Sequence, residues 1–222
     1  MATIQSGIPV ARIELLDDVM MNAVNRYSKL DYPVMPTLFF EFHGSEAAVA
    51  EQATRVGEIA REQGGGDFQW ASRPEDRSRL WQARDNTLYA SMALRPSSRA
   101  LITDVCVPIS RLAECVTETR RDIDGSGLTV CIVGHVGDGN FHLLILVDPA
   151  DAAEIGRARA LHDRMVQRAL AFEGTCTGEH GIGLGKQKWL TEELGEAVDV
   201  MRDIKRLFDP DNLMNPGKLI PM

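Results

Sequence analysis

The chain has 222 residues, of which 44% are hydrophobic and 25% are charged, a composition typical of a folded globular domain. Its 32 acidic residues outnumber its 24 basic ones, so the formal net charge is −8. Affinity for nucleic acid comes from clustered cations, and the sequence has no run of five basic residues. We therefore expect no nucleic-acid partner.

The sequence also carries few signals for export or for the membrane. The N-terminal residues lack a cationic stretch followed by an apolar one, so no secretory signal is expected. The longest uncharged apolar run, residues 143–147, is far too short to cross a bilayer. The four cysteines, Cys106, Cys115, Cys131 and Cys176, form no C-x-x-C pair and indicate reduced thiols. We expect a cytoplasmic protein whose membrane contact, if it has one, is peripheral to the inner membrane.

The order of predicted elements indicates an α+β fold. Short apolar or alternating runs predict strands at residues 9–15, 37–42, 100–107, 129–135 and 141–147. Helical periodicity predicts helices at residues 17–29, 45–63, 74–93, 109–122, 151–173 and 191–208. Ser45, Ser110 and Asp151 are the expected N-caps. The pattern favours an antiparallel or mixed sheet with helices on one face, built from split β-α-β units in a ferredoxin-like manner, and a C-terminal helical segment.

The most informative segment, residues 134–142, reads GHVGDGNFH. Its Asp-Gly pair between two apolar runs is a strong signal for a two-residue hairpin turn. Counting outward from that turn places His135 directly opposite His142, with Cβ atoms roughly 4.5–5.5 Å apart. Two imidazoles at this separation could share one divalent cation such as zinc. The alternative is that each histidine makes only local hydrogen bonds.

A second segment, residues 175–186, reads TCTGEHGIGLGK. Its glycines do not have the spacing of a phosphate-binding loop or of a dinucleotide-binding fingerprint. Glu179 would complete a set of two histidines and one carboxylate with the hairpin, leaving positions open for substrate, and His180 would be free to act as a base. The alternative is a mobile surface loop. Cys176 is a weaker candidate nucleophile, because a small buried thiol is the commoner role.

Arg84 is a candidate anion-binding residue. It falls on the helical face that Leu80, Trp81 and Leu88 share. An arginine on an apolar stripe needs a carboxylate, because an unpaired buried cation is costly. That carboxylate belongs either to a protein side chain or to a substrate held bidentately, and the sequence leaves both alternatives open.

Four motifs can be compared with known families: HVGDGNFH at residues 135–142, TGEHGIG at 177–183, TDVCVP at 103–108 and LMNPGK at 213–218. Together they resemble the C-terminal half of FAD-linked oxidases of the vanillyl-alcohol-oxidase type. Within that group the chain looks most similar to the cytochrome-linked D-lactate dehydrogenases, with glycolate oxidase flavoprotein subunits and D-2-hydroxyglutarate dehydrogenases as near relatives. The resemblance extends over essentially the whole chain.

The resemblance implies a division of the chain. Residues 1–172 would form a substrate-binding cap domain, and residues 173–222 would form the Gly-rich active-site loop, the last helix and the C-terminal tail. The N-terminal FAD-binding domain of the family would be absent from this chain and would act as its partner. FAD would be bound mainly by that missing half.

The resemblance also implies roles for individual residues. His135, His142 and Glu179 would bind a divalent metal (zinc, manganese or iron), and His180 would be the catalytic base. Arg84 would bind the substrate carboxylate.

Three further positions follow from the same resemblance. Arg99 aligns with a family lysine that also faces the substrate carboxylate. Arginine at this position keeps the positive charge of the lysine but not the shape of its ammonium group. Asn215 would approach the flavin, although the Pro-Gly pair after it is by itself a chain-reversal signal. Leu88 stands where a hydroxyglutarate-type relative carries threonine, which favours a substrate with a small or apolar side chain.

These assignments predict the substrate- and metal-binding part of a flavin-dependent D-2-hydroxy acid dehydrogenase. It would oxidise D-lactate to pyruvate, pass electrons to a cytochrome or a quinone, and be inactive without its FAD domain. Two alternatives remain open from the residues. The chain could be a non-enzymatic small-acid-binding or regulatory module. The metal site could also be purely structural, closed by a fourth ligand such as Asp138 or Cys176.

Overall fold

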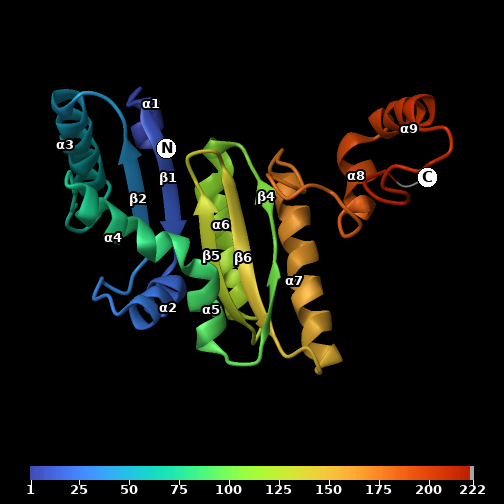
Figure 1. Ribbon diagram of the computed structural model, residues 1–222, viewed down its shortest axis with the longest axis horizontal. Coiled ribbons are helices and arrows are strands. Elements are labelled where there is room, and N and C mark those ends of the chain that lie inside the picture. The colour runs from blue at the N-terminus through green and yellow to red at the C-terminus, as the bar shows by residue number, and fades with distance from the viewer. Residues whose placement is uncertain (221–222) are drawn as a thin grey trace.

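The computed structural model describes residues 1–220 and contains an antiparallel sheet with helices around it (Figure 1). The described strands are β1 (Val10–Leu16), β2 (Thr37–Phe42), β3 (Arg99–Ile102), β4 (Val105–Cys106), β5 (Thr129–His135) and β6 (Asn140–Val147). The described helices are α1 (Ala2–Gln5), α2 (Asp18–Ser28), α3 (Glu46–Glu62), α4 (Pro74–Asp85), α5 (Thr87–Leu94), α6 (Ile109–Asp124), α7 (Ala152–Ala171), α8 (Gln187–Leu194) and α9 (Ala197–Phe208).

The strand order is β2-β1-β5-β6-β3, and β4 also pairs with β6. Every pairing is antiparallel. Both β3 and β5 run antiparallel to β6, so they are parallel to each other with β6 between them. The connection from β3 through α6 to β5 is therefore a split β-α-β unit. The predicted α+β class with an antiparallel sheet is confirmed.

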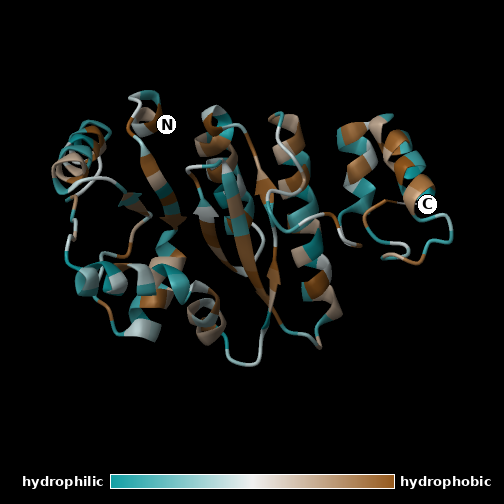
Figure 2. Cartoon of the chain, turned by 45° about the horizontal axis from the view of Figure 1, so that its top comes forward, coloured by the Kyte–Doolittle hydropathy of each residue, from teal (hydrophilic) through white to brown (hydrophobic). Residues whose placement is uncertain are grey.

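The expectation that helices cover one face of the sheet is wrong, because both faces are covered. Helices α2, α4 and α5 pack on one face, where they contact Cys131, Val133 and Leu144. Helices α6 and α7 pack on the other face, against Val130 and Ile132. In Figure 1, α5 lies in front of the sheet and α6 behind it. All eight residues of β6 are consequently buried, and its continuous apolar run suits a strand covered on both sides (Figure 2).

The structure subdivides three of the predicted elements. The helix expected at 74–93 breaks at Asn86 into α4 and α5. The strand expected at 100–107 is interrupted between β3 and β4, and the last helix is divided at Gly195, whose φ is +55°. Of the expected N-caps, Ser45 and Asp151 accept the predicted backbone hydrogen bonds. Ser110 does not cap α6, which begins at Ile109 after Pro108.

The C-terminal helices α8 and α9 lie beyond α7, on the side of the molecule away from β1 and β2 (Figure 1). The Gly-rich segment before α8 connects them to α7, and its Thr175 pairs with Cys106 of β4. Within residues 1–220, we find no helix whose length and apolar character would allow it to span a bilayer.

Candidate active site

The two histidines of the hairpin lie on the same face of the sheet, but not in the predicted register. Val133, not His135, is directly opposite His142, because the loop contains the four residues 136–139 in place of a two-residue turn. A shift of two residues keeps both imidazoles on one face, since side chains alternate with period two. The rings are diagonal neighbours with centroids 5.6 Å apart. Direct opposition was therefore wrong, while proximity is confirmed.

His135 is oriented by a buried acid on the neighbouring strand. Glu14 on β1 is the cross-strand partner of His135, and its Oε1 lies 2.8 Å from His135 Nδ1. The hydrogen bond to Glu14 is the main reason that the pKa of His135 is raised. Since a carboxylate can only accept, Nδ1 carries the proton and Nε2 is left as the available ligand atom.

His142 is oriented in the same way by a backbone carbonyl. Its Nδ1 donates to the carbonyl oxygen of Thr103 at 3.0 Å, in the segment between β3 and β4. Burial lowers the pKa of His142, which favours the neutral imidazole that metals bind. Its Nε2 therefore also presents a lone pair.

Glu179 approaches both of these nitrogens from the Gly-rich segment. Its Oε1 lies 3.1 Å from His142 Nε2 and 3.4 Å from His135 Nε2. Ligand atoms about 2.1 Å from one cation would be about 3.0–3.4 Å apart for right-angled to tetrahedral geometry. Three lone pairs that converge in this way repel one another unless a cation or a proton lies between them. The donor set and its spacing fit a divalent metal, and the predicted convergence of the three residues is found.

His180 lies beside this cluster. Its ring stacks on that of His142 with centroids 5.0 Å apart, and its Nε2 is 3.7 Å from Glu179 Oε1. The side chain is 44% exposed, so a ligand can reach it. His180 therefore borders the three ligand atoms without being fixed by a short hydrogen bond of its own.

Arg84 of α4 pairs with the same acid that orients His135. Its Nε donates to Glu14 Oε2 at 2.8 Å, and the Arg84 and Glu14 side chains are 17% and 3% exposed. Burial tends to raise the pKa of Glu14, but hydrogen bonds from His135 and Arg84 outweigh it and lower the pKa. The terminal nitrogens of Arg84 make only long contacts of 3.5 Å, to Thr87 Oγ1 and His135 Nε2. The Glu14 carboxylate thus binds the Nε of Arg84, whereas the two terminal nitrogens of Arg84 remain open to a ligand.

Arg99 does not join the cluster. It pairs with Val147, five residues along β6 from His142, which corresponds to roughly 16 Å. Val147 packs with α7, whereas Leu144, on the same face as His142, packs with α2 and α5. Because directly paired residues point to the same face, Arg99 points away from the histidines. Arg99 therefore lies apart from the histidine cluster, and its contact with the substrate carboxylate stays a prediction.

The remaining predicted positions have simpler environments. Asn215 is exposed, has a φ of +48°, and its carbonyl accepts the Lys218 N–H, so it forms the predicted chain reversal; its approach to a flavin stays a prediction. Cys176 is buried, and burial raises the pKa of its thiol to about 12, which fits the small buried thiol better than a nucleophile. Among residues 1–220, the converging metal-ligating groups include neither Cys176 nor Asp138.

With this geometry established, the chain can be compared with known proteins. Residues 1–219 match the family described as FAD linked oxidases, C-terminal domain. The chain belongs to this family. It is 55% identical over 220 residues to a probable mitochondrial D-lactate dehydrogenase of Danio rerio, covering 99% of this chain and 44% of that protein. It is 47% identical over 221 residues to the mitochondrial D-lactate dehydrogenase [cytochrome] of Arabidopsis thaliana, covering 99% and 39%.

More distant relatives agree with this assignment. Glycolate oxidase subunit GlcD of Escherichia coli K12 is 31% identical over 221 residues, covering 98% of this chain and 44% of that protein. The solved structure of 4-ethylphenol oxidase from Gulosibacter chungangensis has a similar fold, with a TM-score of 0.66 and 15% identity, over 99% of this chain and 51% of that one. This FAD-oxidase C-terminal domain therefore spans less than half the length of the curated relatives it matches.

Two acids of this FAD-oxidase C-terminal domain were missed by sequence reasoning. Glu14 interrupts the apolar strand β1, and Asp104 interrupts the apolar run 100–107. Both are buried, and both contact the predicted site residues. The position of each acid inside an apolar run could have indicated a functional or structural contact, because a buried carboxylate requires partners that stabilise its charge.

One glycine of the loop is required by close packing. A Cβ at Gly178 would lie 1.7 Å from Nδ2 of Asn140, which is itself buried and bonded to Asp104. We expect Gly178→Ala to lower the free energy of unfolding by about 1–3 kcal/mol, the usual cost of overpacking. Gly185→Ala is the matched control, since its Cβ would meet no atom within 4 Å and its φ is not positive. Urea unfolding of both variants measures the difference, and equal stabilities would contradict the packing argument.

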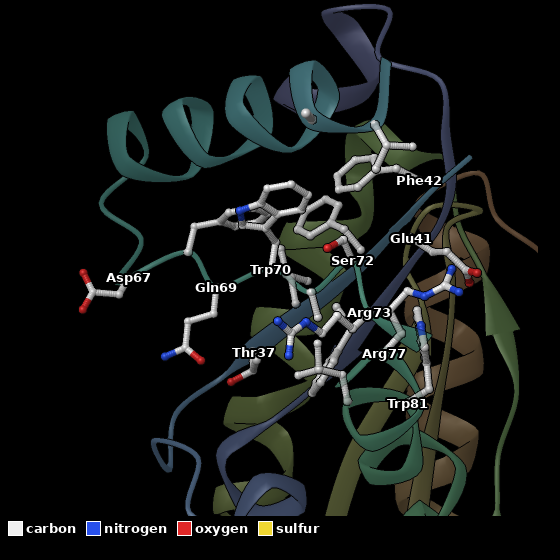
Figure 3. Close-up of a pocket in the computed structure, with 18 of the residues that line it drawn as sticks. Thr37, Glu41, Phe42, Asp67, Gln69, Trp70, Ser72, Arg73, Arg77 and Trp81 are labelled. Carbon is white, nitrogen blue, oxygen red and sulfur yellow. The ribbon is translucent and has the colours of Figure 1, made fainter. Parts of the chain in front are cut away.

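A separate cavity of about 890 Å³ lies between β2, α3 and α4 (Figure 3). Its walls include Phe42, Trp70 and Trp81, and the cavity does not include any of the histidines of the cluster. Trp81 also stacks on the guanidinium of Arg12, 3.4 Å from the ring centroid. The histidine cluster is therefore distinct from the aromatic-lined cavity.

Proposed function

We propose that the chain is the substrate- and metal-binding part of a flavin-dependent D-2-hydroxy acid dehydrogenase, which oxidises D-lactate to pyruvate and passes electrons to a cytochrome or a quinone. The observation that carries this proposal is the convergence of His135 Nε2, His142 Nε2 and Glu179 Oε1 beside Arg84 and His180. Relatives named D-lactate dehydrogenase and glycolate oxidase support it.

His135, His142 and Glu179 would hold a zinc, manganese or iron ion. A divalent cation at this position would lower the pKa of a substrate hydroxyl. The local charges favour such an ion. Three carboxylates (Glu14, Asp104, Glu179) face two cations (Arg84, Lys186). These five side chains have a net charge of −1. A divalent ion would change the net charge of the site to +1, which a monocarboxylate substrate would balance.

Arg84 would bind the substrate carboxylate through its two terminal nitrogens. Glu14 holds the Nε side of the guanidinium at 2.8 Å and so fixes the orientation of the remaining fork. Bidentate binding by arginine fixes the direction of a carboxylate as well as its position. The hydroxyl-bearing carbon of a short acid would then lie near the three ligand atoms.

His180 would accept the proton of the hydroxyl at Nε2, the nitrogen that faces Glu179. Histidine is the commonest general base, and this ring is accessible and lies next to the ligand cluster. His135 and His142 are unsuited to this role, because Glu14 and Thr103 hold their Nδ1 atoms and their Nε2 atoms are the proposed metal ligands. The chain thus contains separate groups for binding and for proton removal.

FAD would supply the hydride acceptor, so this chain is expected to be inactive unless it is joined to a flavin-binding portion. The experiment is to join it to the remaining part of the Danio rerio relative and to measure reduction of cytochrome c by D-lactate. We expect turnover with D-lactate, little with L-lactate, loss of activity after chelation, and recovery with Zn²⁺ or Mn²⁺. Turnover of D-lactate by the 222-residue chain alone, or an assembled protein whose activity is indifferent to chelation, would contradict the proposal.

A further inference from the structure

Asp104 is a completely buried acid next to the candidate active site, and the function proposed above uses only its charge. It lies between β3 and β4, both of which pair with β6. Its side chain is 0% exposed. A carboxylate in such a place must be stabilised by many donors, because its charge is otherwise lost or the fold is destabilised.

The donors to Asp104 come almost entirely from the Gly-rich loop. Oδ2 accepts the hydroxyl of Thr177 at 2.7 Å and the N–H groups of Gly178, Glu179 and His180 at 2.9, 3.1 and 2.9 Å. Three successive N–H groups thus surround one carboxylate, as in the backbone nests that bind anions.

Two further partners complete the environment of Asp104. The side chain of Asn140 donates to Oδ1 at 2.8 Å, and Lys186 Nζ lies 3.4 Å from Oδ2 and 2.6 Å from the Asp104 carbonyl oxygen. Burial alone would raise the pKa of Asp104, but the hydrogen bonds from His180, Asn140 and Thr177 hold it well below its ordinary range. The carboxylate is therefore held at the base of the loop by donors from both the loop and the hairpin.

Asp104 is poorly suited to be a metal ligand itself. Its oxygens lie near His142 and His180, within a set of atoms compact enough for an ion. However, Oδ1 and Oδ2 already accept hydrogen bonds from a side-chain amide, a hydroxyl and three backbone amides. Coordination of a cation would require several of these bonds to break.

Thr103 and Asp104, which are adjacent in the chain, hold both the hairpin part and the loop part of the cluster. The carbonyl of Thr103 orients His142 through Nδ1, and the carboxylate of Asp104 binds the amides of Glu179 and His180. Asn140, which precedes His142 by two residues, is tied to the same carboxylate. The position of the loop relative to the hairpin is thus set at one point.

We infer that Asp104 is a positioning residue that sets the distance between the loop groups Glu179 and His180 and the hairpin histidines. Its role as a determinant of metal affinity rests on the function proposed above. The hydrogen bonds from residues 177–180 to Asp104, which we call the clamp, do not depend on that function, because they are present without a metal.

The test compares Asp104→Asn with Glu154→Gln in the 222-residue chain. Asparagine has nearly the same shape as aspartate, but it turns one acceptor into a donor that faces other donors. Glu154 is a matched control, because its carboxylate is 8% exposed, accepts from Arg95 Nη1 and the Asp148 N–H, and lies outside the cluster. Circular dichroism establishes that both variants are folded at the temperature used.

Two readouts are measured. In metal-free protein, hydrogen exchange of a peptide containing residues 178–180 is expected to be at least about tenfold faster in Asp104→Asn and unchanged in Glu154→Gln. Titration with Zn²⁺ alone is expected to show an affinity about 10–100-fold weaker in Asp104→Asn, the usual effect of removing a group that orients ligands, with no loss in Glu154→Gln.

A folded Asp104→Asn variant with wild-type exchange and wild-type Zn²⁺ affinity would overturn the inference. Equal losses of affinity in both variants would also overturn it, since they would indicate a general effect of stability. If the wild-type chain binds no Zn²⁺, the proposed function fails, and the exchange measurement alone decides whether the clamp exists. Should Asp104→Asn not fold, Gly178→Ala disturbs the clamp through Asn140, with Gly185→Ala as control, and the same two readouts apply.

Discussion

Replacement of His180 by alanine in the assembled enzyme is expected to lower kcat for D-lactate by about 10²–10⁴-fold, the range that general-base catalysis contributes. The reason is geometric. His180 stacks on His142 with its Nε2 3.7 Å from Glu179 Oε1, while the other two imidazoles are held by Glu14 and Thr103. Among residues 1–220, His180 is the accessible imidazole that borders the three ligand atoms without being one of the proposed ligands.

Zn²⁺ affinity of His180→Ala is expected to stay close to that of the wild type, because His180 is not one of the three convergent ligand groups. His142→Ala should show the opposite pattern, with loss of Zn²⁺ binding. His43→Ala is the control for both, since the ring of this exposed histidine pairs with Glu41 and lies outside the cluster. A His180→Ala enzyme with unchanged kcat would exclude His180 as the base. A parallel loss of metal would reassign it as a ligand.

Replacement of Arg84 by alanine is expected to lower the free energy of unfolding by about 3 kcal/mol, since it removes the arginine that neutralises a buried charge and leaves His135 as the remaining partner of that charge. That charge is Glu14, whose side chain is 3% exposed and loses its 2.8 Å hydrogen bond from Nε. In the assembled enzyme the same variant should also raise KM for D-lactate, because the two terminal nitrogens of Arg84 are the proposed carboxylate site.

The double variant Arg84→Leu with Glu14→Gln separates these two effects. With both charges removed, the unfolding free energy should return towards the wild-type value, whereas KM should stay high. Urea unfolding and initial-rate kinetics give the two quantities. Recovery of KM together with stability would show that Arg84 serves only to neutralise Glu14, which is the protein-carboxylate alternative that the sequence left open.

Much of the candidate site could be predicted from local sequence. The Asp-Gly pair correctly indicated a reversal between two apolar strands, and the period-two alternation correctly placed His135 and His142 on one face. The register was wrong because the chain forms a four-residue loop in which Gly139, with a φ of +83°, has a positive φ and Asp138 does not. Turn type depends on contacts outside the turn, such as the Gly137 N–H donating to the Ile13 carbonyl on β1.

The position of Arg99 relative to the histidines also depends on tertiary structure. Resemblance to a family assigns a role to a charged residue. Only the pairing of β3 with β6 decides which face of the sheet the Arg99 side chain lies on. The break at Asn86 is a related case. It places Thr87, in place of Leu88, next to Arg84, while Leu88 packs against the core.

The sequence by itself determined the chemistry that is available here: two histidines near a reversal, a carboxylate and a histidine in a glycine-rich segment, and an arginine on an apolar helical face. These follow from residue type and short-range spacing, which local physics governs. Tertiary structure alone decided that Glu14 orients both His135 and Arg84, and that Asp104 binds the loop amides. Those partners are 70 to 121 residues apart along the chain, and their contacts depend on which strands pair and which helices cover them. Such choices minimise the free energy of the whole fold, so no local pattern encodes them.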